Sequence, residues 1–218
     1  MKIQDIELKW LGHSGFLIVN SEGKRVYIDP YHISENNEKA DIILITHSHQ
    51  DHCSIKDIQK IVKEGTIVLG PADIQSKITK LDNHIELRVV VPGQTIDLGF
   101  VKLGIVPAYN LNKQFHEKEE HWVGYIIKIN GSLIYHAGDT DLIPEMKNMK
   151  NISIALLPVG GHFTMDWKEA VQAASLIYPT LAIPMHYGSD VVGTTEDAEN
   201  FVRGCKEKGI KAERLEKE

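Results

Sequence analysis

The stretch Thr46-His47-Ser48-His49-Gln50-Asp51-His52 contains four side chains that can bind a metal ion. It follows the apolar run Ile42-Ile43-Leu44-Ile45, which is short, β-branched and bounded by polar residues, and which is therefore predicted to be a buried strand. Side chains alternate along an extended chain, so His47 and His49 are expected to point to the same side and to bind one ion. Asp51 and His52 follow where the chain turns towards a helix, and they could face a second ion.

The residue types in this stretch indicate which metals it would take. Imidazole and carboxylate ligands suit zinc, with iron or manganese as alternatives. The competing interpretation is a surface loop with solvated histidines. It is disfavoured because functional residues concentrate at junctions between strands and loops.

The composition is typical of one soluble globular domain spanning residues 1–218. The net charge of −6 means that the protein surface as a whole is not basic, which argues against general binding to nucleic acid. The N-terminus has no signal-peptide pattern, and no apolar run approaches the ~20 residues of a membrane span. We therefore expect a cytoplasmic protein without a membrane anchor. The two cysteines, Cys53 and Cys205, make no disulfide framework.

Hydrophobic patterning alternates between strands and helices along the chain. The first strand is expected from Ile3 to Leu8, and Ser54 is expected to cap a helix from Ile55 to Val62. Further helices are predicted over residues 71–80, 167–177 and 196–208. The second half repeats the β-rich order of the first and contains the hairpin dipeptide Asn130-Gly131. Two β-rich halves, each with helices, predict an α+β fold with two sheets face to face and helices outside.

Three strands of the second half end in a Gly-containing loop that carries a polar side chain. These are Ser132–Tyr135 before Asp139, Ala155–Leu157 before His162, and Leu181–Ile183 before His186. This is the arrangement expected of a site that is assembled at one rim of a sheet.

Together these motifs resemble the metallo-β-lactamase superfamily. The resemblance is carried by His47-x-His49-x-Asp51-His52, Gly138-Asp139-Thr140 and Met185-His186-Tyr187-Gly188, and it extends over nearly the whole chain from Leu11-Gly12-His13-Ser14 onwards. The segments Leu157 to Met165 and Pro184 to Gly188 are similar to small metal-dependent hydrolases related to L-ascorbate-6-phosphate lactonase. The resemblance implies a four-layer αββα sandwich built on two mixed sheets.

The resemblance also implies a role for each residue of the motifs. His47 and His49 would bind a first metal ion, Asp51, His52 and His186 would bind a second, and Asp139 would bridge the two. A hydroxide held between two zinc ions would be the nucleophile, because metal charge lowers the pKa of bound water from ~15.7 towards neutrality. Asp51 could also orient this hydroxide or relay a proton.

One position departs from the superfamily pattern. The third ligand of the first metal is usually a histidine in a short Ala-x-His stretch, but here that stretch is Pro107-Ala108-Tyr109-Asn110. An amide oxygen is a weaker ligand for zinc than imidazole. His116, which follows in the same polar segment, is the expected replacement. The alternatives are that Asn110 completes the site or that the site has no third protein ligand.

Further side chains could support this site. His162, in a Gly-rich loop, is the candidate for a substrate contact or for the general acid on the leaving group, against a packing role. His13 could line the pocket or donate to the substrate, but a local hydrogen bond explains it equally well. His136 could hydrogen-bond a metal ligand, but it could equally be a buried neutral histidine. Asp29 is expected to support the metal loop from behind, and Cys53 is expected to pack as a small apolar residue.

These features indicate a metal-dependent hydrolase acting on a small, anionic ester, lactone or phosphoester. No basic run with interleaved aromatics is present, which argues against a nucleic-acid substrate. The alternative is a non-catalytic metal-binding or ligand-sensing module on the same fold, which the Asn110 substitution keeps open. A redox di-iron protein is disfavoured because it would need a carboxylate in place of His49. Exposed edge strands leave room for a homo-oligomer.

Overall fold

Strand β5 (Ile42–Leu44) lies in the interior of a sheet, and all three of its residues are almost fully buried. It pairs in parallel with β4 (Arg25–Ile28) on one side and with β6 (Ile67–Gly70) on the other. A continuous apolar run is what a parallel strand covered on both faces requires. The computed structural model, which describes residues 1–3, 5–81 and 84–218, thus confirms the strand predicted ahead of the histidine run.

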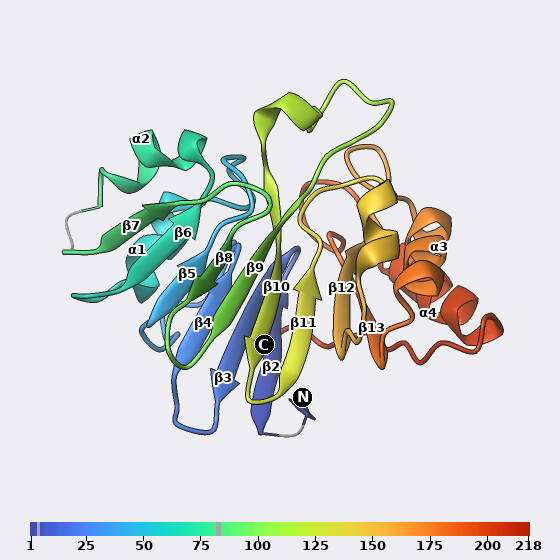
Figure 1. Ribbon diagram of the computed structural model, residues 1–218, viewed down its shortest axis with the longest axis horizontal. Coiled ribbons are helices and arrows are strands. Elements are labelled where there is room, and N and C mark those ends of the chain that lie inside the picture. Colours follow the sequence, from blue (N-terminus) through green and yellow to red (C-terminus); the bar gives the residue numbers. More distant parts are fainter. Residues whose placement is uncertain (4, 82–83) are drawn as a thin grey trace.

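The remaining strands complete two mixed sheets (Figure 1). They are β1 (Lys2–Ile3), β2 (Ile6–Gly12), β3 (Gly15–Asn20), β7 (Glu86–Val89), β8 (Thr95–Asp97), β9 (Lys102–Pro107), β10 (Val123–Ile129), β11 (Ser132–His136), β12 (Ile154–Pro158) and β13 (Leu181–Met185). Among the described residues the first sheet runs in the order β1 to β7, antiparallel up to β4 and parallel beyond it. The second runs β13-β12-β11-β10-β9-β8, with β11, β12 and β13 parallel.

Helices cover the outer faces of the two sheets, which confirms the predicted four-layer sandwich (Figure 1). The helices α1 (Ile55–Ile61) and α2 (Gln75–Ile78) lie beside the first sheet, and α3 (Trp167–Ile177) and α4 (Thr195–Glu207) lie beside the second. Short 3-10 turns occur at η1 (Ala72–Ile74), η2 (Lys118–Glu120) and η3 (Pro144–Asn148). In the part of the chain that is described, no helix combines the length and apolar character needed to cross a membrane.

Two apolar cores, formed by residues that the structure describes, hold the layers together. The larger core combines buried residues of both sheets with residues of α3 and α4, for example Phe16, Leu156 and Phe201. The smaller core lies under α1, where Ile58 and Ile61 pack with residues of the first sheet. Ser54 caps α1 as predicted, because its side chain accepts a hydrogen bond from the Asp57 amide.

Two predicted elements differ from the structure. The single strand expected from Ile3 to Leu8 was wrong, because β1 and β2 are separate and pair antiparallel with Ile3 opposite Ile6. Residue 4, inside that prediction, lies outside the described residues. Alternating apolar residues cannot distinguish one strand from a tight hairpin, since both expose the same face. The helix expected over 71–80 is instead the turn η1 followed by the short helix α2.

A buried leucine of β12 should contribute far more to stability than a leucine on the outside of α3. Leu156 is fully buried, whereas Leu176 is 39% exposed. We expect Leu156→Ala to lower the free energy of unfolding by ~2–5 kcal/mol, because it leaves a cavity in the core. Leu176→Ala should change it by less than ~0.5 kcal/mol. Urea denaturation followed by circular dichroism measures both, and equal losses would contradict the placement of β12 in the core.

Candidate metal centre

Loops at strand ends bring the metal-competent side chains to one place. Strand β5 leads into the loop of residues 45–52, β11 leads into the loop that holds Asp139, and β13 ends directly before His186. His116 comes from the long connection between β9 and β10. Because β4 and β5 are parallel, as are β11, β12 and β13, these strands deliver their carboxyl ends to a common edge. The predicted ligands from both halves of the chain therefore meet.

The first group of side chains consists of His47, His49 and His116. One ring nitrogen of each lies within 4.8 Å of the others, and His47 Nε2 is 3.1 Å from His49 Nδ1. His47 and His116 are buried, whereas His49 is exposed. The Trp122 ring packs against all three imidazoles, with centroid separations of 4.7, 4.9 and 5.1 Å. The first group is thus open to solvent only on the side of His49.

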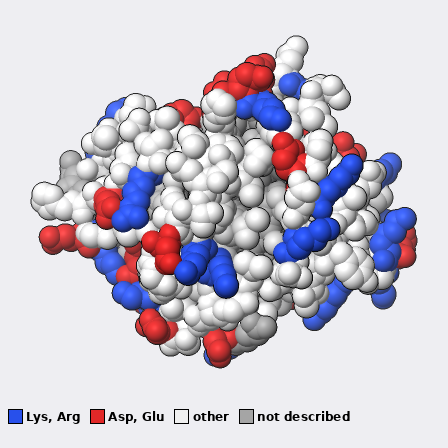
Figure 2. All heavy atoms as spheres, viewed as in Figure 1, with Lys and Arg blue, Asp and Glu red and all other residues white. Residues whose placement is uncertain are grey.

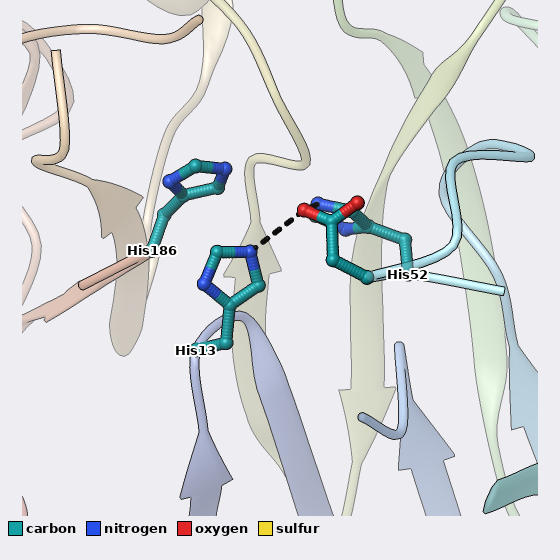
Figure 3. A group of neighbouring side chains, drawn as sticks. His13, His52 and His186 are labelled. Carbon is teal, nitrogen blue, oxygen red and sulfur yellow. Dashed lines mark hydrogen bonds and ion pairs between the residues drawn. The ribbon is translucent and has the colours of Figure 1, made fainter. Parts of the chain in front are cut away.

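The second group consists of His13, Asp51, His52 and His186 (Figure 3), whose ligand atoms also lie within 4.8 Å of one another. Asp51 Oδ2 is 2.9 Å from His13 Nε2 and 3.3 Å from His52 Nε2. The rings of His13 and His186 are 4.1 Å apart between centroids. The group therefore contains the three ligands that the resemblance implies for a second ion, together with His13.

Asp139 is almost fully buried and lies between the two groups. Its Oδ2 is 3.0 Å from His186 Nε2 and 3.3 Å from His52 Nε2, both in the second group. The same oxygen is 3.4 Å from His116 Nε2 and 4.0 Å from His47 Nε2, both in the first group. One carboxylate oxygen thus faces nitrogens of both groups, which is the position that a bridging ligand needs.

Close packing fixes the loop that carries Asp139. Gly138 has a φ of +66°, and a side chain at this position would meet the Val123 carbonyl at 2.8 Å, so the loop requires glycine. His136 accepts a hydrogen bond from the Gly138 amide through Nδ1 (3.2 Å) and donates from Nε2 to the Ser14 carbonyl (2.9 Å). His136 is therefore the buried neutral histidine of the two alternatives, and it supports the loop through the backbone.

Asp29 holds the loop of residues 45–52 through hydrogen bonds on the side away from the proposed metal site, as the sequence predicts. It is fully buried and accepts hydrogen bonds from the Thr46 amide (2.8 Å), the Thr46 hydroxyl (2.6 Å) and His52 Nδ1 (2.7 Å). Because His52 donates from Nδ1, its Nε2 is the ring nitrogen that faces the centre and that would bind a metal ion in the neutral ring. Nothing in the sequence pointed to this role of Thr46 except its place directly before the histidine run.

Asn110 ties together the loop that brings His116 into the first group. Its side-chain amide donates to the carbonyls of Phe115 (2.9 Å) and Phe163 (2.8 Å). Its backbone amide donates to the His116 carbonyl (2.7 Å). The chain therefore folds back after Asn110, and the His116 ring reaches His47 and His49. Among the alternatives left open by the sequence, this geometry favours His116 as the third nitrogen.

Burial and neighbouring charges act in different directions on the groups of the centre. Burial would lower the pKa of His52, but the carboxylates of Asp139, Asp29 and Asp51 outweigh it and raise this pKa well above its ordinary value. Burial and the neighbouring His52 lower the pKa of His47 well below its ordinary value, and burial and His186 lower the pKa of His13 to about 4. Burial alone would raise the pKa of Asp139, but His186 and His52 outweigh it and hold this pKa well below its usual range. Neutral imidazole and charged carboxylate are the forms that bind metal ions.

Unpaired buried atoms show that the centre suits a divalent metal ion. His52 Nε2, His116 Nε2 and Asp139 Oδ1 are buried and lack a hydrogen-bond partner within the described structure. Burying such polar atoms without a partner costs free energy, which coordination to a metal would recover. Imidazole nitrogens with carboxylate oxygens are a donor set for zinc, manganese or iron.

His162 lies outside the three metal-competent groups found among the described residues. It is exposed, and its ring packs against Phe163 and Phe115 with centroid separations of 4.4 and 5.8 Å. Gly160, in the same loop, approaches His186 so closely that a side chain there would lie 2.9 Å from Nδ1 of that ring. The loop therefore borders the second group, and the catalytic role of His162 stays a prediction.

Two residues near the metal loop show what local sequence can and cannot indicate. Cys53 is confirmed as a packing residue, because it lies in the smaller core and burial raises the pKa of its thiol to about 12. His13 is buried in the second group, although the sequence indicated only a turn near the pocket. Its contact with Asp51 joins segments far apart in the chain, which hydrophobic periodicity does not report.

Comparison with other proteins agrees with this geometry. A profile of the Beta-lactamase superfamily domain matches residues 7–186. A UPF0173 metal-dependent hydrolase of Thermococcus onnurineus is 36% identical over 196 residues, which cover 84% of this chain and 85% of the relative. One from Nanoarchaeum equitans is 34% identical over 220 residues, covering 98% of both chains. A crystal structure of a metal-dependent hydrolase from Parabacteroides distasonis matches with a TM-score of 0.85 and 31% identity, over 98% of this chain and 94% of that chain.

A more distant match extends only to the fold. A diiron β-hydroxylase from Streptomyces venezuelae has a TM-score of 0.75 over 98% of this chain and 53% of its own, but it is only 17% identical. The resemblance to the lactonase-related branch stays a prediction. The superfamily prediction is confirmed: this chain belongs to the beta-lactamase superfamily and, within it, to the UPF0173 metal-dependent hydrolases.

Proposed function

We propose that this chain hydrolyses a small, anionic ester, lactone or phosphoester with the help of bound metal. The observation that carries the proposal is the position of Asp139 Oδ2, which lies within 3.4 Å of the Nε2 atoms of His52, His116 and His186. A carboxylate flanked by two sets of nitrogens supports two ions side by side. The relatives from Thermococcus and Nanoarchaeum, which are named metal-dependent hydrolases, support the same kind of activity.

The proposed metals are two zinc ions, with manganese or iron as alternatives. His47, His49 and His116 would hold one ion, Asp51, His52 and His186 would hold the other, and Asp139 would be shared. Bound divalent ions lower the pKa of a coordinated water and polarise an oxygen of the substrate. Their charge exceeds that of the Asp51 and Asp139 carboxylates, which favours a substrate with negative charge.

The chain's own side chains are proposed to orient the reactants and to move protons. Asp51 is partly exposed and faces His52, so its carboxylate can orient the attacking water and accept a proton from it. Asp29 keeps His52 turned towards the centre through its 2.7 Å hydrogen bond to Nδ1. His162, on the exposed loop beside the second group, is proposed to protonate the leaving group.

The surface supports a small molecule as the substrate. On the face shown in Figure 2, basic and acidic side chains are interspersed, and the middle of that face is largely uncharged. Such a distribution gives the described part of this face no continuous basic track for a phosphate backbone.

The alternative function is a metal-binding or ligand-sensing module without catalysis. It requires that the first group bind its metal ion weakly. The missing histidine at Asn110 was the reason to consider it. Because His116 stands within 4.8 Å of the other two imidazoles, the first group again has three nitrogens. The geometry therefore favours the hydrolase.

Metal-loaded protein should hydrolyse at least one member of a set of generic substrates. Suitable probes are p-nitrophenyl acetate for esters, glucono-δ-lactone for lactones and bis-p-nitrophenyl phosphate for phosphodiesters. Removal of metal by dialysis against a chelator should abolish turnover, and added Zn²⁺, Mn²⁺ or Fe²⁺ should restore it, because water activation requires the charge of the metal. Initial rates measure both effects. Protein that holds metal but turns over none of these classes would favour the sensing module.

Loss of His162 should slow hydrolysis in a way that depends on the leaving group. For an alkyl ester or alkyl phosphoester, which has a poor leaving group, His162→Ala should lower kcat by ~10²-fold, because proton donation is lost. For the matching p-nitrophenyl substrate the change should be small. His84→Ala is the control, since His84 is also exposed but lies outside all three metal-competent groups. An equal loss with both leaving groups would rule out the acid role of His162.

A further inference from the structure

We infer that Ser189 and His13 form a hydrogen-bonded support that fixes the Asp51 carboxylate in the second group. His13 would thus be a positioning residue for the metal centre. The inference rests on the proposed function, because it concerns how one half of that centre is held. It extends the proposal to two residues, His13 and Ser189, for which the sequence implied no role towards the metal.

The His13 ring connects Ser189 with Asp51. Its Nδ1 is 2.9 Å from Ser189 Oγ, and its Nε2 is 2.9 Å from Asp51 Oδ2. Ser189 Oγ also accepts a hydrogen bond from the Val191 amide at 3.3 Å. The serine hydroxyl proton is therefore free to go to His13 Nδ1, and the ring then donates from Nε2 to the carboxylate. Figure 3 shows the His13 ring beside that of His186.

The hydrogen bonding of His13 differs from that of two proposed ligands, His52 and His116. Both of its ring nitrogens have partners, whereas His52 Nε2 and His116 Nε2 are buried without one. A nitrogen prepared for a metal needs a free lone pair, while a nitrogen that carries a proton and donates it to a carboxylate has none. His13 therefore has the character of a residue that orients Asp51.

The turn that carries His13 is held by both sheets. The His13 carbonyl accepts hydrogen bonds from Trp10 Nε1 (2.9 Å) and from the His186 amide (3.0 Å). The neighbouring Ser14 carbonyl accepts one from His136 Nε2 (2.9 Å). His13 has a φ of +51°, which is unfavourable for a residue other than glycine and persists only where the surroundings impose it. The turn between β2 and β3 therefore holds the His13 ring in a fixed position.

The consequence for Asp51 follows from its exposure. The Asp51 side chain is 19% exposed, whereas that of His13 is 1% exposed. Without the hydrogen bond from His13, the carboxylate would be free to rotate towards water and away from His52. Residues that orient a metal ligand in this way typically contribute about 10–100-fold to metal affinity.

Zinc affinity measured on full-length protein tests this inference without relying on turnover. Metal-free protein is titrated with Zn²⁺ in competition with a chromophoric chelator. We expect His13→Ala to weaken one of the two zinc sites by about 10–100-fold and to leave the other unchanged. His13→Gln should recover most of the affinity, because its amide can donate to Asp51 but binds zinc poorly. Ser189→Ala should weaken the same site by a smaller factor, and His84→Ala should match the wild type.

The outcomes separate this inference from the proposed function. Wild-type protein that binds none of Zn²⁺, Mn²⁺ and Fe²⁺ would overturn the proposed function itself. Two zinc sites that keep their affinity in both His13→Ala and Ser189→Ala would overturn the support role and leave the function standing. Loss of the ion in His13→Gln as complete as in His13→Ala would make His13 a direct ligand and would also overturn the support role. Ser189→Ala leaves the ring in place, so it decides the question if His13→Ala does not fold.

Discussion

The burial of one carboxylate among imidazole rings is the constraint on which the arrangement of this protein depends. Asp139 is 3% exposed, and its Oδ2 has nitrogens of His186, His52 and His116 within 3.4 Å. A buried charge of this kind is stable only when other groups compensate it. The compensating rings come from the loop after β5, from the β9–β10 connection and from the residue that directly follows β13. Both sheets must therefore meet at this edge, and the face-to-face packing of the sandwich is what brings them there.

Backbone strain is concentrated around the same centre. His13, Asp29, His116 and His186 all have left-handed backbone conformations, with φ between 43° and 59°. Such conformations are costly for residues other than glycine and survive where hydrogen bonds and packing determine them. Hydrogen bonds hold the backbone in these conformations here. The Thr46 amide donates to Asp29, and the Asn110 side chain donates to the carbonyls of Phe115 and Phe163. Part of the stability supplied by the apolar cores thus offsets the strain of holding these side chains at fixed positions.

The sequence predicted the parts of this structure that are encoded locally. The strand before His47 and the helix after Ser54 are visible as periodicity and capping, and both are confirmed. The positions of Asp139 and His186 followed from resemblance to a superfamily, because each alone is an ordinary residue at the end of a strand. The break between β1 and β2 could not be predicted, since a tight hairpin preserves the alternation of a single strand.

Contacts between distant segments account for what the sequence could not indicate. The amide of Asn110 holds the carbonyl of Phe163, and His13 meets Asp51 on one side and Ser189 on the other. Periodicity reports the local backbone and says nothing about which loops converge. The substitution at Asn110 therefore looked like the loss of a ligand, although the same residue anchors the loop that carries His116.

The proposed binuclear centre requires that Asp139 join the two groups of side chains. The most direct measurement is an anomalous difference map from zinc-loaded crystals, recorded on both sides of the zinc absorption edge. We expect two zinc peaks flanking Asp139, one among His47, His49 and His116 and the other among Asp51, His52 and His186. A single peak, or zinc bound only away from Asp139, would contradict this expectation.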